Sequence, residues 1–399
     1  MDVNNLMDFS IARLPKIEFG CGRFLKVASI AHGFGQRVLL VTGASSFSQT
    51  ANWELLLRQF DELGINFTHV TIDGEPSPDR VDDIVAGHRG RDFDVVLAIG
   101  GGSALDAGKA IAGLLNIGDS VMDYLEGVGP EKTYQGPAVP FIAVPTTAGT
   151  GSEATKNAVL SRHGAHGFKK SFRDEQLVAD IAVIDPDLLA SCPQSVIAAN
   201  GMDALTQLME SYVSLKTNEF NNALGLRGLA AARDGLLRLY DSKGQDSQAR
   251  ENMAYASFIS GINLAQTGLG SVHGLASPLG AFYPVPHGVV CGTLVAAATK
   301  INTEAMLARE PDNIALNGYK KVAEILLHRH YRQQDEALQD LVMLLETWTE
   351  KMQIQKLSHY GLQEEEFDRV IAHARGSSMK TNPIVLSDDE LHKILKARL

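Results

Sequence analysis

The sequence is short of cysteine and of long apolar runs. Its three cysteines, Cys21, Cys192 and Cys291, are too scattered to form a disulfide framework or a zinc ribbon. The longest apolar run, near residues 289–298, is too short to cross a bilayer. The N-terminus carries an early acidic residue and lacks an apolar core, so no secretory signal is expected. These absences predict a cytoplasmic protein without a membrane partner.

Positive charge is also scarce. The chain has 36 Lys and Arg residues against 47 Asp and Glu residues, which gives a formal net charge of −11. This balance argues against a nucleic-acid partner and against binding to anionic membrane surfaces. The length of 399 residues exceeds what one hydrophobic core normally serves, so we expect two domains in an enzyme-sized globular protein.

The first half of the sequence alternates strand-like and helix-like segments. Short apolar runs typical of buried parallel strands are separated by amphipathic helical patterns at 53–63 and 78–86. This alternation predicts right-handed crossovers and a Rossmann-like parallel sheet, in which ligands bind beyond the carboxyl ends of the strands. Strands are expected at 37–42, 67–72, 96–99, 141–144 and 181–184.

The pattern changes after Asp185 and Pro186. From there to the C-terminus, apolar residues recur with the 3.6-residue period of α-helices. We therefore expect an α/β dinucleotide-binding domain over residues 1–186 and an all-α domain over residues 187–399. The clearest helical stretches are 204–213, 223–240, 253–264, 318–327 and 336–348.

A glycine-rich turn follows the third predicted strand. Gly100, Gly101 and Gly102 allow the backbone to turn sharply and to approach another molecule closely. The N–H groups and the dipole of the helix that begins near Ser103 suit a pyrophosphate. Leu105 stands where the usual dinucleotide fingerprint has its third glycine, so a tight turn without a ligand is the alternative.

Two further loops lie at predicted carboxyl ends of strands. Gly43 and Ser45 belong to the loop after the first predicted strand. Thr146 and Thr147 belong to the loop 145–153, which combines hydroxyl groups with a predicted helix N-terminus. Such a loop suits a ribose or a phosphate, and the alternative is a capped loop that holds no ligand.

Four polar residues in the second half could hold a divalent metal. Asp203 and Gln207 lie four residues apart on a predicted helix, so their side chains share a face. His273 and His287 lie in stretches of small and apolar residues. A carboxylate and two imidazoles suit a divalent metal, and an amide oxygen would be a fourth ligand. The alternative is that the two histidines are structural.

The ordered motifs make the sequence similar to the iron-containing (group III) alcohol dehydrogenases along nearly its whole length. The matching pieces are 100–103 with Asp106 and Lys109, 145–153, 184–186, 201–205, 273–274, 278–280, 286–288 and 378–383. The resemblance implies a Rossmann-like nucleotide domain followed by a helical domain that binds metal and substrate, the dehydroquinate synthase-like fold. It also implies NAD or NADP as coenzyme and one divalent metal, iron or zinc.

The resemblance assigns roles to particular residues. It implies that Asp203, Gln207, His273 and His287 hold the metal, although the family has histidine where this chain has Gln207. Catalysis is expected around His273 and His287, with Ser277 in place of a further family histidine near the nicotinamide. Coenzyme contacts are expected at Gly43, Ser45, Gly100, Gly101, Gly102, Ser103, Asp106, Thr146, Thr147 and Lys169.

The function implied is that of an NAD(P)-dependent alcohol dehydrogenase or aldehyde reductase acting on a small alcohol or aldehyde. One alternative is a metal-independent reductase on the same fold, in which Gln207 and Ser277 hydrogen-bond the substrate. Another is a nucleotide-binding protein that has lost catalysis. The family's usual assembly implies a homodimer, to which residues 16–19 would supply an edge strand.

Position 43 bears on the choice of coenzyme. NAD-specific enzymes commonly place a carboxylate beside the adenosine ribose, where it repels a 2′-phosphate. In the resembling family, NAD-preferring members carry Asp directly after the Val-Thr pair at this strand end. This chain has Gly43 there, followed by Ala44, Ser45 and Ser46. We therefore expect NADP(H) to be favoured, and the alternative is equal use of both coenzymes.

Overall fold

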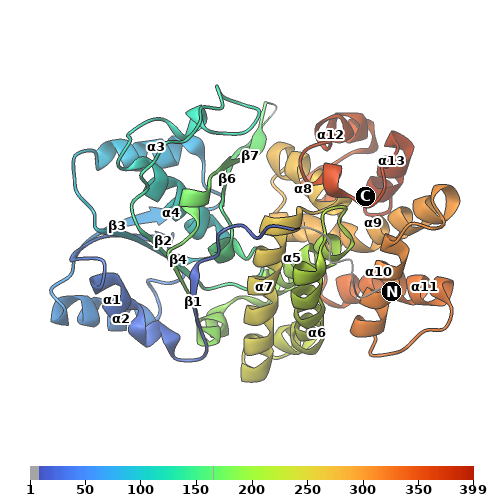
Figure 1. Cartoon of the computed structure of the whole chain (residues 1–399), viewed down its shortest axis with the longest axis horizontal. Coiled ribbons are helices and arrows are strands. Elements are labelled where there is room, and N and C mark those ends of the chain that lie inside the picture. The colour runs from blue at the N-terminus through green and yellow to red at the C-terminus, as the bar shows by residue number, and fades with distance from the viewer. Residues whose placement is uncertain (1–8, 165) are drawn as a thin grey trace. The chain divides into compact units, whose positions relative to one another are not determined.

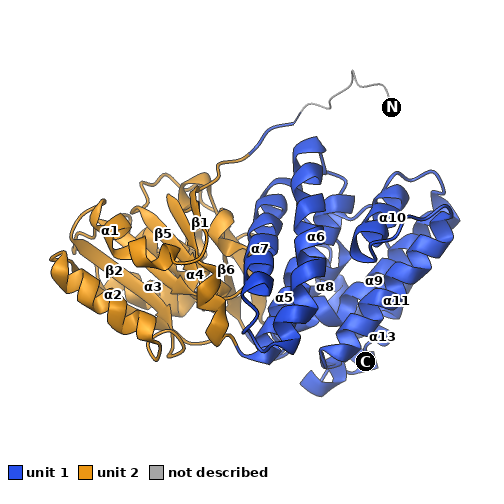
Figure 2. Ribbon diagram, turned by 90° about the horizontal axis from the view of Figure 1, so that it is seen from below, with its two compact units in different colours: residues 1–11, 163–166, 193–399 blue, residues 12–162, 167–192 orange. Residues whose placement is uncertain are grey.

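The structure is a computed structural model that describes residues 9–164 and 166–399 (Figure 1). The chain forms two compact units, which Figure 2 colours separately. One is built on a parallel β-sheet and the other on helices, which confirms the fold class expected from the sequence. The sheet unit comprises residues 12–162 and 167–192, and the described part of the helical unit comprises residues 193–399 with the short segments 9–11, 163–164 and 166.

The described part of the sheet unit contains a six-stranded sheet in which neighbouring strands run parallel. Its strands are β1 (Lys16–Phe19), β2 (Arg37–Gly43), β3 (Asn66–Ile72), β4 (Val95–Gly100), β5 (Phe141–Pro145) and β8 (Ile181–Ile184). Their order is β1-β8-β5-β4-β2-β3, so the direction of winding reverses between β2 and β4. Ligands of doubly wound sheets bind at such a switch point.

Helices cover both faces of this sheet because successive strand residues point to opposite sides. Leu39 and Val41 pack with the residues of α3 and α4, whereas Val38 and Leu40 pack with those of α1 and α2. Both faces are apolar, which explains why the central strands read as continuous apolar runs. The helices are α1 (Val27–His32), α2 (Ala51–Glu62), α3 (Pro78–Gly87) and α4 (Gly102–Leu114).

The sequence analysis missed an antiparallel hairpin, β6 (Asn157–Arg162) with β7 (Phe168–Arg173). The prediction of a helix N-terminus in the loop 145–153 was wrong. The loop ends instead in a single 3₁₀ turn, Ser152–Ala154, after which Thr155 is already extended. Gly151 adopts a left-handed φ of 60° before this turn, which glycine tolerates and which leads the chain into β6 rather than into a helix.

The helices of the helical unit cover the five stretches expected from the sequence, except that α10 ends one residue before Leu327. The helix α5 (Gln194–Val213) is buried along most of its length, which is typical of a central helix. It packs against α6, α7 and α9. The other helices are α6 (Glu219–Asp241), α7 (Ser247–Thr267), α8 (Ser271–Phe282), α9 (His287–Arg309), α10 (Ala315–Leu326), α11 (Gln334–Lys351), α12 (Phe367–His373) and α13 (Asp388–Lys396).

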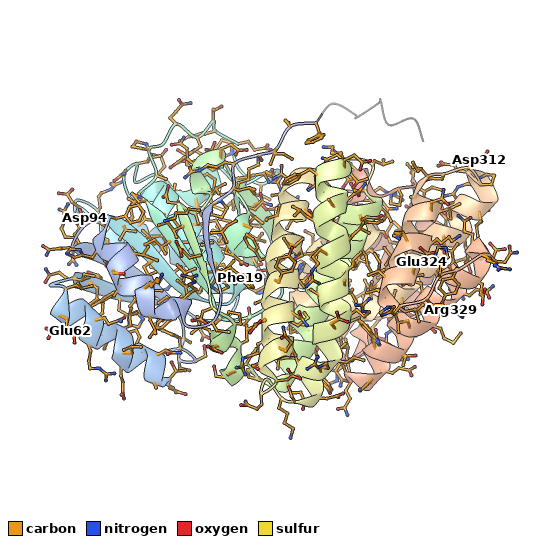
Figure 3. All side chains as sticks on the ribbon, turned by 60° about the horizontal axis from the view of Figure 1, so that its bottom comes forward. Phe19, Glu62, Asp94, Asp312, Glu324 and Arg329 are labelled. Carbon is orange, nitrogen blue, oxygen red and sulfur yellow. The ribbon has the colours of Figure 1, made fainter. Side chains whose placement is uncertain are left out.

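Charged side chains lie mainly on the outside of each unit. Glu62 of the sheet unit and Asp312 and Arg329 of the helical unit are exposed (Figure 3). Within the described residues, no helix combines the length and the apolarity that crossing a membrane requires.

Candidate functional site

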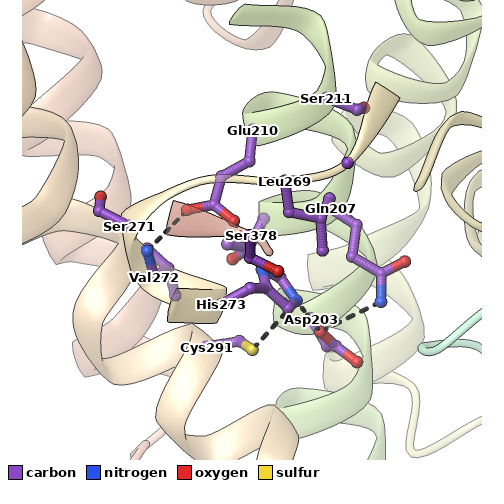
Figure 4. A network of polar contacts seen from close by, with 12 residues as sticks. Asp203, Gln207, Glu210, Ser211, Leu269, Ser271, Val272, His273, Cys291 and Ser378 are labelled. Atoms are coloured by element: carbon purple, nitrogen blue, oxygen red, sulfur yellow. Dashed lines mark hydrogen bonds and ion pairs between the residues drawn. The ribbon is translucent and has the colours of Figure 1, made fainter. Parts of the chain in front are cut away.

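Four side chains of the helical unit converge in its interior. They are Asp203 on α5, His273 on α8, and His287 and Cys291 on α9 (Figure 4 labels three of them). One ligand atom from each lies within 4.8 Å of all the others. The residues span almost ninety positions of the chain, so only the packing of α5, α8 and α9 brings them together.

The glycine that follows His287 explains how α9 comes so close to α5. A Cβ atom at Gly288 would lie 2.5 Å from the carbonyl oxygen of Ala199 on α5. No side chain fits at that distance, so glycine allows the first turn of α9 to rest on the α5 backbone. This contact places His287 beside Asp203.

The distances within the cluster are those of direct polar contact. Asp203 Oδ1 lies 3.2 Å from His273 Nε2 and 3.8 Å from His287 Nε2. Cys291 Sγ lies 3.5 Å from His273 Nε2. Asp203, His273 and Cys291 are buried, so these contacts are shielded from water.

The carboxylate of Asp203 is not fully satisfied by the protein. Its Oδ1 atom contacts both imidazoles, but its buried Oδ2 atom has no hydrogen-bond partner among the described residues. A buried carboxylate oxygen without a partner is costly, and a cation would remove that cost. A carboxylate, two imidazoles and a thiol are ligands that divalent metals such as zinc use. The residues present therefore fit the metal that the resemblance implies.

The buried charges shift the ionisation of these groups. Burial alone would raise the pKa of Asp203, but the neighbouring His287 and His273 outweigh burial and lower it. Burial alone would lower the pKa of His273, but the interactions with Cys291, with Glu210 and with Asp203 outweigh burial and raise that pKa. Burial raises the pKa of the Cys291 thiol to about 12.

Glu210 orients one of the histidines, and the sequence analysis missed it. Its Oε2 atom lies 2.6 Å from His273 Nδ1, and its Oε1 atom accepts a hydrogen bond from the N–H of Val272 at 2.7 Å. A carboxylate on one imidazole nitrogen turns the other toward a metal. Glu210 follows Asp203 by two helical turns, so a buried acid on that face was the available signal.

Two hydrogen bonds orient the side-chain amide of Gln207, the expected fourth ligand. Its Oε1 atom accepts a hydrogen bond from Ser260 Oγ at 2.8 Å, and its Nε2 atom donates to Asp203 Oδ1 at 3.4 Å. The amide therefore presents its nitrogen, which has no available lone pair, toward the cluster. Ser277 lies one turn beyond His273 on α8 and is partly exposed.

The sheet unit brings the expected coenzyme residues to one edge. Gly43 and Gly100 end the adjacent strands β2 and β4, at the point where the order of the strands reverses. Gly101 caps α4, and a Cβ atom there would lie 3.3 Å from Thr147 Oγ1. A Cβ atom at Gly102 would meet Thr150 at 2.8 Å, so the turn and the loop after β5 touch.

The loop 145–153 is held to α4 by a buried lysine. Lys109 donates hydrogen bonds to the carbonyl oxygens of Ser152 at 2.8 Å and of Asn157 at 2.6 Å. Asp106 Oδ1 accepts a hydrogen bond from Ser152 Oγ at 2.5 Å and lies 3.3 Å from Lys109 Nζ. The structure thus places Asp106 where it supports the loop that carries Thr146 and Thr147.

The other expected coenzyme residues occupy separate positions. Ser103 lies in the first turn of α4, and Ser45 lies in the loop after β2. Lys169 lies on β7, and its Nζ atom is 2.5 Å from Glu75 Oε1. The carboxylate of Glu75 also accepts a hydrogen bond from Ser161 Oγ on β6, so Glu75 contacts both strands of the hairpin.

Models of one family account for nearly the whole chain. The model described as iron-containing alcohol dehydrogenase matches residues 15–186, and the model of the C-terminal part of the Fe-containing alcohol dehydrogenase family matches residues 197–399.

Individual proteins are similar over comparable lengths. Alcohol dehydrogenase 4 of Saccharomyces cerevisiae (strain YJM789) is 32% identical over 344 residues, which is 85% of each chain. The NADPH-dependent butanol dehydrogenase of Clostridium saccharobutylicum is 27% identical over 98% of this chain and 97% of its own. A crystal structure of a 1,3-propanediol oxidoreductase is 26% identical and superimposes with a TM-score of 0.87, covering 98% of this chain and all of its own.

The loop 145–153 generates a prediction about pH, because its buried Glu153 has a pKa raised by burial to about 7. Between the unfolded value of 4.5 and this value, the folded protein holds a proton that the unfolded chain releases. The free energy of unfolding should therefore fall as pH rises through this window. In Glu153→Gln this contribution is absent. We expect the wild type to lose about 2 kcal/mol relative to the variant between about pH 5 and 8.

Urea unfolding at both pH values measures this difference. Glu62→Gln, which changes an exposed glutamate of the same unit, is the matched control and should follow the wild type. A constant difference between wild type and Glu153→Gln across the pH range would show that Glu153 titrates normally.

Proposed function

Because this chain belongs to the iron-containing alcohol dehydrogenase family and is an NAD(P)-dependent alcohol dehydrogenase of that type, we propose that it uses a divalent metal at Asp203, His273 and His287 with NADP(H) as the favoured coenzyme. The substrate class is a small alcohol or its aldehyde. The observation that carries the metal site is the convergence of these three side chains, together with the buried Oδ2 atom of Asp203, which has no hydrogen-bond partner among the described residues.

Each residue of the cluster has a separate task in this proposal. Asp203 supplies the negative charge, and the two imidazoles supply neutral nitrogen ligands. Glu210 accepts a hydrogen bond from the Nδ1–H group of His273, which leaves the Nε2 lone pair pointing into the cluster. When bound, a divalent metal supplies Lewis-acid polarisation of the substrate oxygen. Hydride transfer itself is the chemistry of the nicotinamide.

We also propose a location in the cytoplasm. The three cysteines are scattered along the chain, which suits a reducing compartment.

The proposed choice of coenzyme is supported by the position of Gly43. This residue ends β2 beside the switch point of the sheet, where an adenosine ribose is expected. Gly43 brings no negative charge to oppose a 2′-phosphate, and Ser45 and Ser46 add hydroxyl donors to the same loop. Lost repulsion and neutral donors would therefore favour NADP(H).

The proposed homodimer is supported by strand β1. It lies at one edge of the sheet, and no other described strand covers its outer side. Lys16 and Gly20 direct their N–H groups to β8, so the N–H of Ile17 points to the open edge. Ile17 is 41% exposed, and open edges of sheets pair readily with another chain.

The first prediction from the proposed function concerns the metal ligands. Replacing His287 by Ala removes one nitrogen ligand, so metal affinity should fall by about 100-fold or more and aldehyde reduction should be lost. Metal analysis after dialysis and coenzyme oxidation with a panel of aldehydes measure the two effects. His359→Ala, at an exposed histidine of the same unit, should retain both. Full activity in metal-free wild type would favour a metal-independent reductase instead.

The second prediction concerns the coenzyme. A Cβ atom at Gly43 would lie 3.7 Å from Ser46 Oγ, so a side chain fits there. Gly43→Asp should lower the ratio of kcat/KM for NADPH to that for NADH by roughly tenfold or more, because the new carboxylate repels a 2′-phosphate. Gly43→Ala adds a side chain without charge and should keep the wild-type ratio. A clear NADH advantage in the wild type would contradict the proposed preference.

The third prediction concerns assembly. Light scattering should give the mass of two chains for the wild type. Ile17→Pro removes an N–H that faces the open edge and leaves the bonds to β8 intact, so it should shift the protein toward the monomer. Ile17→Thr keeps that N–H and should remain a dimer. A monomeric wild type at micromolar concentration would end this proposal.

A further inference from the structure

We propose that the thiolate of Cys291 is the fourth protein ligand of the metal, which makes the site an Asp–His–His–Cys centre selective for zinc. This inference rests on the metal site of the proposed function and goes beyond the four positions that the family resemblance implies. Coordination would exchange the thiol proton of Cys291 for the metal and release that proton to solvent.

The spacing of the donor atoms supports this assignment. Metal bonds of about 2.0 Å to nitrogen or oxygen and about 2.3 Å to sulfur, at tetrahedral angles, put neighbouring donors roughly 3.3–3.6 Å apart. Cys291 Sγ lies 3.5 Å from His273 Nε2 and 3.8 Å from His287 Nε2. Asp203 Oδ1 lies 3.2 Å from His273 Nε2. Asp203 Oδ1 lies 3.8 Å from His287 Nε2, and all four donors lie within 4.8 Å of one another, so a tetrahedral site needs only a small contraction of the cluster.

The helix α9 holds Cys291 in this place. Cys291 follows His287 by four residues, so the two side chains share one face of the helix. The next residue is Gly292, where a Cβ atom would lie 2.9 Å from the Cβ atom of Met202 on α5. Glycine at this point lets α9 press against α5 next to Asp203. The sulfur is therefore confined to the cluster and is not accessible to solvent.

The orientation of the Gln207 amide leaves the position of the fourth metal ligand to Cys291. The amide oxygen of Gln207 faces Ser260, and its nitrogen faces Asp203. Gln207 stands where the family resemblance implies an imidazole, while the thiol of Cys291 lies within the cluster. The chain keeps four metal-binding side chains by supplying the fourth from α9 instead of α5.

The ligand types decide which metal suits the site. A thiolate combined with imidazoles and one carboxylate in tetrahedral array is typical of zinc, and zinc binds such sites more tightly than ferrous iron. Catalytic zinc sites also expand to five ligands during reaction, so four protein ligands do not exclude a substrate.

Cobalt substitution tests the thiolate directly. The full-length protein is stripped of metal and titrated with Co²⁺, and the near-ultraviolet thiolate-to-cobalt charge-transfer band is recorded. We expect the band in the wild type and its loss in Cys291→Ser, with affinity for Co²⁺ reduced by about tenfold or more. Cys192→Ser, at a cysteine outside the cluster, should keep both the band and the affinity. The double variant Gln207→His/Cys291→Ser should regain affinity without the band.

Each result separates this inference from the proposed function. Co²⁺ binding by the wild type without the band would overturn the role of Cys291 but leave the proposed metal site intact. A band that persists in Cys291→Ser would have the same consequence. Failure of the wild type to bind Co²⁺ would overturn both. Circular dichroism shows whether each variant is folded. If a variant is not folded, the presence or absence of the band in the wild type still decides whether Cys291 binds the metal.

Metal competition tests the selectivity. Apoprotein incubated anaerobically with equal amounts of Zn²⁺ and Fe²⁺ should contain predominantly zinc by elemental analysis. Gln207→His/Cys291→Ser, which restores the ligand types of the family, should contain a larger share of iron. A wild type that takes up mostly iron would overturn the selectivity for zinc.

Discussion

The helical unit depends on one buried charge, the carboxylate of Asp203 in the middle of α5. Its side chain is only 1% exposed, and a charge removed from water is costly unless it is paired. His273 on α8 and His287 on α9 both face its Oδ1 atom. The helices α8 and α9 therefore contribute both the packing around α5 and the partners that this buried charge needs.

The groups around Asp203 also orient one another. Glu210 holds His273 through Nδ1, and the same carboxylate caps the start of α8 at Val272. Buried polar networks of this kind are rigid when every member has a partner. The buried Oδ2 atom of Asp203 has no hydrogen-bond partner among the described residues, and it marks where the network would accept a cation.

The candidate sites of the two units are built from different parts of the chain. In the sheet unit the edge proposed for the coenzyme is formed by backbone, since Gly43 and Gly100 end adjacent strands and the loop after β5 touches the glycine turn. The helical unit prepares its cluster with side chains from three helices. Backbone sites tolerate changes in side chains nearby, whereas a side-chain cluster changes its ligands when one residue changes. Gln207, where the family resemblance implies histidine, is such a change.

The sequence by itself determined the features that are encoded locally. The parallel strands, the glycine turn at 100–102 and the helices of the second half follow from apolar periodicity and glycine placement, and the family followed from ordered motifs. The hairpin β6–β7 was missed because its strands lack a clear alternating pattern. Only the tertiary structure decided the contacts of Cys291, Glu210 and Gln207. These contacts join residues such as Glu210 and His273, which are 63 positions apart, and no local periodicity records which distant side chains the packing of helices brings together.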